Sequence, residues 1–153
     1  MRRMLSKRLP PIRLDPSLSE THTMHTGSCL CGGIRYRFDG GVTRIGLCHC
    51  SMCCNASGTA YAANAPVPRA AFQLLQGAEL LKAYASSPGK QRWICANCGS
   101  PIYSESATYP DLVRIRLGSL DGPAGHVPDY HYQLSAKADW DLSNDDLPRY
   151  GDD

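Results

Sequence analysis

The sequence predicts a mostly β fold, a single antiparallel β domain stapled by bound metal, with helical structure limited to short turns. Three observations lead to this fold class. Apolar and polar residues alternate with a period of two, no long segment has helical periodicity, and the eight cysteines form three clusters with the spacing of metal ligands. The length of 153 residues favours one domain.

The first 23 residues differ from the rest of the chain. They hold three prolines, five basic and two acidic residues, and no sustained period. We therefore expect a flexible N-terminal extension over residues 1–23 and a domain over residues 24–150. Met24 directly precedes the cysteine-rich region and could be the true start. The remaining residues hold 11 basic and 12 acidic groups, a balance that argues against nucleic acid as a partner.

Strand signals recur along the domain. Apolar residues alternate with arginines or other polar residues, and a Ser-Ser-Pro-Gly sequence between two such segments indicates a hairpin. The predicted strand segments are residues 33–38, 42–48, 80–84, 91–95 and 111–117. Residues 68–76 and 143–147 could each form no more than one or two helical turns.

The sequence contains no segment that would carry the chain into or across a membrane. No apolar stretch approaches the roughly 18 residues that a membrane span needs. The basic residues near the N-terminus are followed by Pro10 and Pro11 rather than by the apolar core of a secretion signal. We therefore expect a cytoplasmic protein without a membrane partner. In such a reducing compartment clustered cysteines more often bind metal than form disulfides.

The third cysteine cluster is the easiest to interpret. Cys95 and Cys98 form a C-x-x-C pair followed by Gly99, the pattern of a zinc knuckle in which glycine closes the turn with positive φ. The same spacing occurs in redox dithiols, which usually lie between a strand and a helix. Because no helix is predicted here, structural zinc is the preferred interpretation.

The first cluster, Cys29 and Cys31, needs partners to complete a metal site. Residues two apart on a strand point to the same side, so both sulfurs could face one ion. A structural zinc site needs four ligands. Cys95 and Cys98 would supply the other two and staple the first strand to a distant hairpin, although spacing alone does not establish this pairing.

The second cluster has three cysteines that could converge on one ion, Cys48, Cys50 and Cys53. Three protein ligands and one open position are the general arrangement of catalytic zinc. Cys54 is interpreted as a spare thiol, the alternative being a fourth ligand that closes the site. His49 lies between two ligands and should point away from them, as a structural residue or as a hydrogen-bond donor to a ligand.

These motifs resemble the glutathione-dependent formaldehyde-activating enzyme family, also called the CENP-V/GFA domain family. The resemblance covers about residues 26–150 and depends on Gly27–Gly33 with Arg35-Tyr36, Cys48-His49-Cys50-Ser51-x-Cys53, Ser57-Gly58, Arg92-x-x-Cys95-x-x-Cys98-Gly99-Ser100, Trp140 and Leu147–Tyr150. The sequence departs from the family at Cys54, where relatives usually carry a longer polar or basic residue.

The resemblance implies a zinc-containing β fold, the GFA-like β-tent, with two Zn²⁺ per chain. Its structural zinc ligands match Cys29, Cys31, Cys95 and Cys98, and its catalytic zinc ligands match Cys48, Cys50 and Cys53. The implied activity is that of a carbon–sulfur lyase or synthase acting on small thiol adducts such as S-hydroxymethylglutathione, formed from glutathione and formaldehyde.

The chemistry of the open site agrees with this activity. Zinc held by three thiolates carries a net charge of −1, yet it can still bind a substrate thiol and stabilise it as thiolate near neutral pH. The bound thiolate could add to an aldehyde, or leave as the C–S bond breaks. Candidates for proton transfer are His49, His126, His131 and Tyr61.

Glutathione carries two carboxylates, so its site needs donors. Six arginines lie on predicted strands: Arg35, Arg37, Arg44, Arg92, Arg114 and Arg116. We expect most of them on solvated strand faces, with some available to line a pocket.

Two other functions remain open at this point. One is a non-catalytic zinc-binding module for recognition or scaffolding. The other is a redox or metal-buffering thiol protein that would use Cys53 and Cys54, although adjacent cysteines rarely form a relaxed disulfide. The partner expected of the enzyme is a small thiol, glutathione among them, and the sequence leaves a homo-oligomer open.

Overall fold

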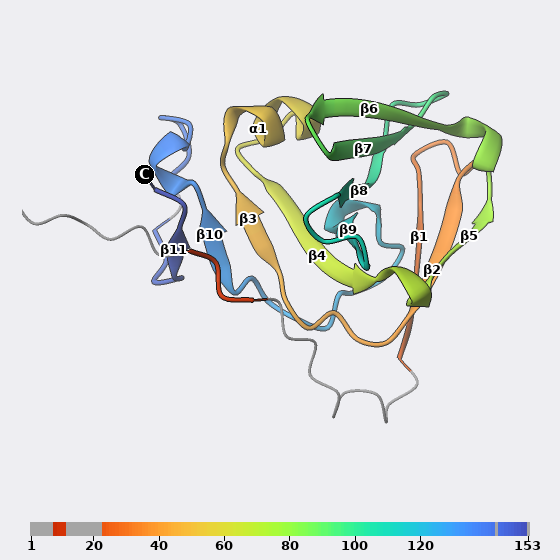
Figure 1. Cartoon of the computed structure of the whole chain (residues 1–153), viewed down its shortest axis with the longest axis horizontal. Helices are drawn as coiled ribbons and strands as arrows, with labels where there is room; N and C mark the ends of the chain where they lie inside the picture. The colour runs from red at the N-terminus through yellow and green to blue at the C-terminus, as the bar shows by residue number, and fades with distance from the viewer. Residues whose placement is uncertain (1–7, 12–22, 143, 153) are drawn as a thin grey trace, which may run out of the picture.

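The computed structural model describes residues 8–11, 23–142 and 144–152, and these residues form the mostly β fold that the sequence predicts. The strands form two sheets (Figure 1). The smaller sheet has three strands in the order β1 (Met24–Ser28), β2 (Arg35–Asp39) and β5 (Phe72–Gln76). The larger sheet has eight, in the order β11 (Arg149–Tyr150), β10 (Tyr130–Tyr132), β3 (Gly46–Cys48), β4 (Ala62–Pro68), β9 (Leu112–Arg116), β8 (Pro101–Ser106), β7 (Lys90–Cys95) and β6 (Leu81–Ser87).

The larger sheet is mixed rather than purely antiparallel. Most neighbouring strands pair antiparallel, as predicted, but β10 pairs parallel with both β3 and β11. A long connection after β9 makes this possible, because it returns the chain to the edge of the sheet in the same direction as β3. The parallel pairing places residues 130–132 beside the strand that leads into the second cysteine cluster.

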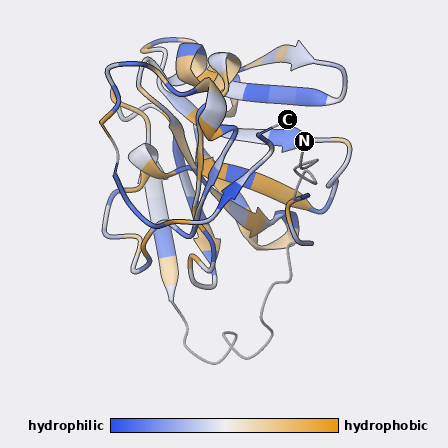
Figure 2. Ribbon diagram, turned by 90° about the vertical axis from the view of Figure 1, so that its left-hand side faces the viewer, coloured by the Kyte–Doolittle hydropathy of each residue, from blue (hydrophilic) through white to orange (hydrophobic). Residues whose placement is uncertain are grey.

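The hydrophobic core contains residues from both sheets. Ile34, Tyr36 and Phe38, which alternate with arginines in the sequence, are at most 1% exposed. Val113 and Ile115 on β9 belong to the same buried cluster. Hydrophobic and hydrophilic residues follow one another along the strands (Figure 2). Because the strands alternate, the arginines of β9 project from the face opposite to the core, where the candidate site lies.

Helical structure is short, but it does not lie where the sequence predicts it. The α-helix within the described ranges is α1 (Ser51–Ser57), inside the second cysteine cluster. Of the predicted turn at residues 68–76 only the 3-10 turn η2 (Arg69–Ala71) forms, and β5 follows it. The chain has no helix at residues 144–147, and residue 143 lies outside the described part. Further 3-10 turns are η3 (Ala78–Leu80), η4 (Leu117–Ser119) and η5 (Leu134–Ala136).

The other strand predictions hold with adjusted bounds. The predicted hairpin is β6–β7, an antiparallel pair joined through Gly89. The segment at 42–48 becomes a strand only from Gly46. Of the predicted N-terminal extension, residues 1–7 and 12–22 lie outside the described part. Within the residues that the structure describes, no helix has the length and apolarity that crossing a bilayer would need.

Candidate metal centres and the adjoining cavities

Four cysteines from two distant parts of the chain meet at one cluster. Cys29 and Cys31 follow β1, whereas Cys95 ends β7 and Cys98 lies in the turn before β8. Their Sγ atoms all lie within 4.8 Å of one another. The Sγ of Cys31 is 3.5 Å from that of Cys29 and 3.8 Å from that of Cys95. The cluster therefore joins the smaller sheet to the larger one.

The backbone around this cluster is arranged to hold thiolates. Gly99 has φ of 77° and donates its N–H to the carbonyl of Cys95 at 2.8 Å, which closes the turn as the sequence predicts. The N–H of Ile34 donates to Cys29 Sγ at 3.2 Å. A hydrogen bond from the Ser100 hydroxyl lowers the pKa of Cys98 to about 5.

The second cluster forms where β3 passes into α1. Cys48 ends β3, Cys50 is the N-cap of α1, and Cys53 lies in its first turn. The helix begins there because the Cys50 thiol accepts a hydrogen bond from the N–H of Cys53, the role that a side-chain oxygen usually has at an N-cap. The Sγ atoms of Cys48 and Cys50 are 3.6 Å apart, and the three sulfurs lie within 4.8 Å of one another.

Cys53 is a thiol of the second cluster whose pKa its neighbours lower. Hydrogen bonds from Cys48, Cys50 and Arg92 and the positive charge of Arg92 lower the pKa of Cys53 to about 4, against the opposing effect of burial. The two terminal nitrogens of Arg92 lie 3.9 and 3.8 Å from Cys53 Sγ. Conversely, the hydrogen bond with Cys53, together with burial, raises the pKa of Cys48.

Both clusters have the dimensions of a thiolate metal site. Tetrahedral zinc with Zn–S bonds of about 2.3 Å holds its sulfurs about 3.8 Å apart. The S···S separations between neighbouring cysteines, 3.5 to 3.8 Å, are close to this value. Cys54 belongs to neither cluster, because its thiol donates to the carbonyls of His49 and Ala60. The first cluster thus offers four sulfurs and the second offers three.

The three-cysteine cluster lines a cavity of about 440 Å³. Alternate residues of the larger sheet project into this cavity, which is how period two brings distant side chains together. Register pairs Arg92 with Ser104 and Ser104 with Arg114 across three strands. The cations that line it are Lys90, Arg92, Arg114 and Arg116, and among its described lining residues no side chain is a carboxylate. The cavity therefore favours an anionic ligand.

The six arginines of the predicted strands divide into two groups. Arg92 and Arg116 are 8% and 6% exposed and face the cavity with Arg114. Arg35 is exposed on β2, and Arg37 is half-buried there. Arg44 lies 4.7 Å over the ring of Tyr130, itself a lining residue. The polar face of β9 is thus a site wall rather than a solvated face.

Two residues of the predicted N-terminal extension also reach this cavity. Leu9 and Pro10 are among its lining residues. The carbonyl of Pro10 accepts a hydrogen bond from Arg44 at 3.4 Å. A segment that precedes the domain in the sequence therefore contributes to the wall of the site.

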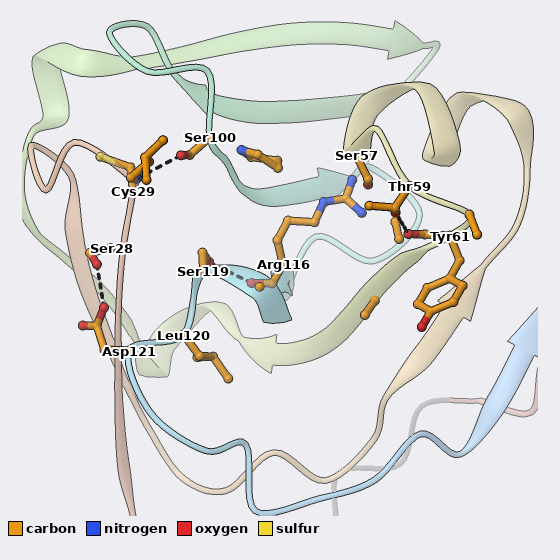
Figure 3. A pocket seen from close by; sticks show the side chains of 16 residues that line it. Ser28, Cys29, Ser57, Thr59, Tyr61, Ser100, Arg116, Ser119, Leu120 and Asp121 are labelled. Atoms are coloured by element: carbon orange, nitrogen blue, oxygen red, sulfur yellow. Dashed lines mark hydrogen bonds between the residues drawn. The ribbon is translucent and has the colours of Figure 1, made fainter.

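A second cavity of about 770 Å³ lies on the other side of Arg116 (Figure 3). Its lining is rich in hydroxyl groups, and the guanidinium of Arg116 reaches toward Ser57 and Thr59. The hydroxyl of Ser119 donates to the carbonyl of Arg116 at 2.7 Å. Arg116 is thus shared between both cavities, and Asn64 accepts a hydrogen bond from its guanidinium.

Two buried histidines form a hydrogen-bonded chain next to the second cysteine cluster in the sequence. His49 is fully buried, and its Nε2 is 2.8 Å from Nδ1 of His131. Nε2 of His131 lies 2.9 Å from the carboxylate of Asp145. Burial lowers the pKa of His49. These hydrogen bonds connect residues 131 and 145 to the segment that contains the second cluster.

None of the four proton-transfer candidates from the sequence lines the three-cysteine cavity. His49 and His131 bond to each other, His126 bonds the carboxylate of Asp129 at 2.9 Å, and Tyr61 lines the second cavity. Lys90 does line the three-cysteine cavity, and the sequence analysis did not identify it as a candidate. Its signal was its position two residues before Arg92, directly before the predicted strand over residues 91–95.

Comparisons with known proteins agree with these motifs. Residues 24–136 match the family described as glutathione-dependent formaldehyde-activating enzyme. A Halomonas elongata protein named "Putative glutathione-dependent formaldehyde-activating enzyme" is 31% identical over 123 residues, which cover 74% of this chain and 77% of that protein. A crystal structure of a Rhodobacter sphaeroides protein matches with a TM-score of 0.58 and 24% identity, over 67% of this chain and 97% of that one. The last match concerns the fold alone.

Proposed function

Because this chain belongs to the glutathione-dependent formaldehyde-activating enzyme family, we propose that it is a zinc-dependent carbon–sulfur lyase or synthase. Its reaction is the formation and cleavage of small thiol adducts such as S-hydroxymethylglutathione. One observation carries this proposal: a cluster of three cysteines lines a cavity whose charged side chains are all cationic among its described residues.

The donor set is suited to zinc. Thiolates are soft ligands and select zinc over magnesium or calcium. Cys29, Cys31, Cys95 and Cys98 would close a structural site, whereas Cys48, Cys50 and Cys53 would hold a catalytic ion with one open position. Zinc bound there would supply a Lewis-acid position at which a substrate thiol is held as its thiolate. A reducing compartment such as the cytoplasm would keep these thiols available.

The chain's own residues would bind and orient the substrate. Three thiolates and one Zn²⁺ sum to −1, and the four cations of the cavity contribute up to +4. The surplus of up to +3 would attract the two carboxylates of glutathione. Arg114 and Arg116 would bind those carboxylates with charge-assisted hydrogen bonds, while Arg92 stays beside Cys53 and neutralises the thiolate cluster.

The experiment that tests this function measures exchange between free glutathione and its formaldehyde adduct by NMR magnetisation transfer, with the uncatalysed rate subtracted. We expect the zinc-loaded protein to accelerate exchange. Arg114→Gln should raise KM for glutathione about tenfold, since a hydrogen bond to a charged group contributes roughly 1.5–3 kcal/mol. The control Arg35→Gln lies on an exposed position of β2 and should change nothing.

A second substrate sharpens the test. An uncharged thiol such as 2-mercaptoethanol should react equally well with the wild-type protein and Arg114→Gln. No acceleration with any thiol at two zinc ions per chain would refute the enzyme and favour a binding module. An equal KM change for both thiols would show that Arg114 supports the fold of the site rather than the carboxylate.

Metal content gives an independent prediction. Elemental analysis of chelator-free protein should find two zinc ions per chain. Cys54→Ser should also retain two, because the Cys54 thiol bonds to backbone carbonyls outside both clusters. One ion in the wild-type protein, or the loss of an ion in Cys54→Ser, would contradict the assignment of ligands.

A further inference from the structure

We propose that Lys90 is the general acid and base of the adduct chemistry, an inference that rests on the proposed function. Lys90 begins β7, directly after the hairpin turn at Gly89. It alternates with Arg92, so both side chains project from the face of the sheet that lines the three-cysteine cavity. Its amine is thereby placed in the same cavity as Cys48, Cys50 and Cys53.

The amine of Lys90 is held in place by a neutral partner. Its Nζ donates to Oγ of Ser104 at 3.0 Å, and Ser104 is only 2% exposed on β8. No carboxylate pairs with Lys90 within the described part of the chain. A structural lysine of this kind would normally have an acidic partner, and the absence of one leaves the proton of Lys90 available.

The surroundings of Lys90 favour its neutral form. Burial, followed by the charges of Arg114, Arg92 and Arg116, lowers the pKa of Lys90 to about 8, with Cys53 acting in the opposite direction. Both protonation states are therefore accessible near neutral pH, as efficient acid–base catalysis requires. The titratable or charged groups that share its cavity are Cys48, Cys50, Cys53, Arg92, Tyr109, Arg114, Arg116, Tyr130 and Tyr132.

No other group of the cavity is as well suited. Arginine does not release its proton in proteins, and burial raises the pKa of Tyr130 above the ordinary tyrosine value. The histidines within the described ranges lie outside the cavity.

The proposed step balances in both directions. As the substrate thiolate attacks the aldehyde carbon, the C–S bond forms and the carbonyl π pair moves to oxygen. The ammonium of Lys90 gives that oxygen a proton and becomes an amine, and the proton lost by the substrate thiol restores it. In the reverse direction the amine takes the hydroxyl proton as the C–S bond breaks and the thiolate leaves.

Lys90→Arg is the decisive variant, because it keeps the charge but cannot release a proton near neutral pH. We expect kcat to fall about 100-fold, with KM for glutathione within threefold of the wild-type value. In the wild-type protein kcat should fall above pH 8 for synthesis and rise toward pH 8 for cleavage. Both pH-dependent changes in kcat should be absent in Lys90→Arg. The control Lys82→Arg lies on an exposed position of β6 and should be inert.

The outcomes separate this inference from the proposed function. If the wild-type protein does not accelerate exchange, the proposed function fails and Lys90 loses its role with it. If the wild-type protein is active and Lys90→Arg keeps kcat and the pH profile, only the role of Lys90 is overturned, and the residue is a carboxylate contact. Retained zinc and melting temperature would establish that the variant folds.

A measurement on the wild-type protein covers the case in which Lys90→Arg misfolds. Competitive labelling of the lysine amines with a limiting acylating reagent, followed across pH by mass spectrometry, reports the ionisation of each lysine. We expect Lys90 to titrate near pH 8. Titration of Lys90 at the ordinary lysine value of about 10.4 would refute the inference.

Discussion

Cys95→Ser should melt at least about 10 °C below the wild-type protein and retain one zinc ion per chain. The reason is the position of the four-cysteine cluster, which joins the segment after β1 in the smaller sheet to the end of β7 in the larger one. Structural zinc sites contribute about 10–16 kcal/mol of apparent binding energy, so losing this ion should cost at least about 4 kcal/mol of stability. At about 2–4 °C per kcal/mol for a chain of this size, the expected shift follows.

Calorimetry and elemental analysis check this result on the same preparation. Cys54→Ser is the matched control, because it changes a thiol outside both clusters and should melt near the wild-type temperature with two ions bound. A Cys95→Ser protein that melted within about 2 °C of the wild-type value would mean that the cluster does not support the fold. Retention of both ions would point to a different ligand set.

The sequence predicts the local parts of both clusters because their geometry is local. The C-x-C and C-x-x-C-G spacings fix which sulfurs can share an ion, and Gly99 adopts the positive φ that the second pattern requires. Alternation likewise predicts which side chains of β9 enter the core. Val113 and Ile115 are buried there, as their spacing indicates.

The larger arrangement depends on pairings that no local pattern encodes. β10 joins β3 in parallel after a separation of more than 80 residues, and only this pairing brings His131 to His49. Alternation also cannot tell a solvated face from a site wall. Arg116 is 6% exposed because the sheet face it lies on borders two cavities.

Helix α1 escaped prediction for a different reason. Its seven residues are too few to develop an amphipathic period. Its start is instead defined by Cys50, whose thiol caps the N–H of Cys53, and cysteine is not among the usual N-cap residues. The cap and the proposed metal ligand are thus the same side chain, which would connect the local fold of this segment to its chemistry.

Cys50→Ser separates these two roles and should lower catalysis of adduct exchange at least 100-fold. Serine is among the preferred N-cap residues, so its hydroxyl can accept from the N–H of Cys53 and α1 should persist. A neutral hydroxyl does not replace a thiolate on zinc, and two cysteines do not make a closed site. We therefore expect one zinc ion per chain and a melting temperature within a few degrees of the wild-type value.

The contrast with Cys95→Ser gives this experiment its force. If the four-cysteine cluster is structural and the three-cysteine cluster is catalytic, Cys95→Ser should be less stable. Cys50→Ser should then lose catalytic activity and keep its fold. A Cys50→Ser protein with two ions, or with exchange within threefold of the wild-type rate, would remove the three-cysteine cluster from the chemistry. Equal destabilisation by both variants would instead favour a module in which both metals are structural. Because Arg92 keeps its contact with Cys53 in Cys50→Ser, a loss of activity there can be ascribed to the ion rather than to an unpaired buried cation.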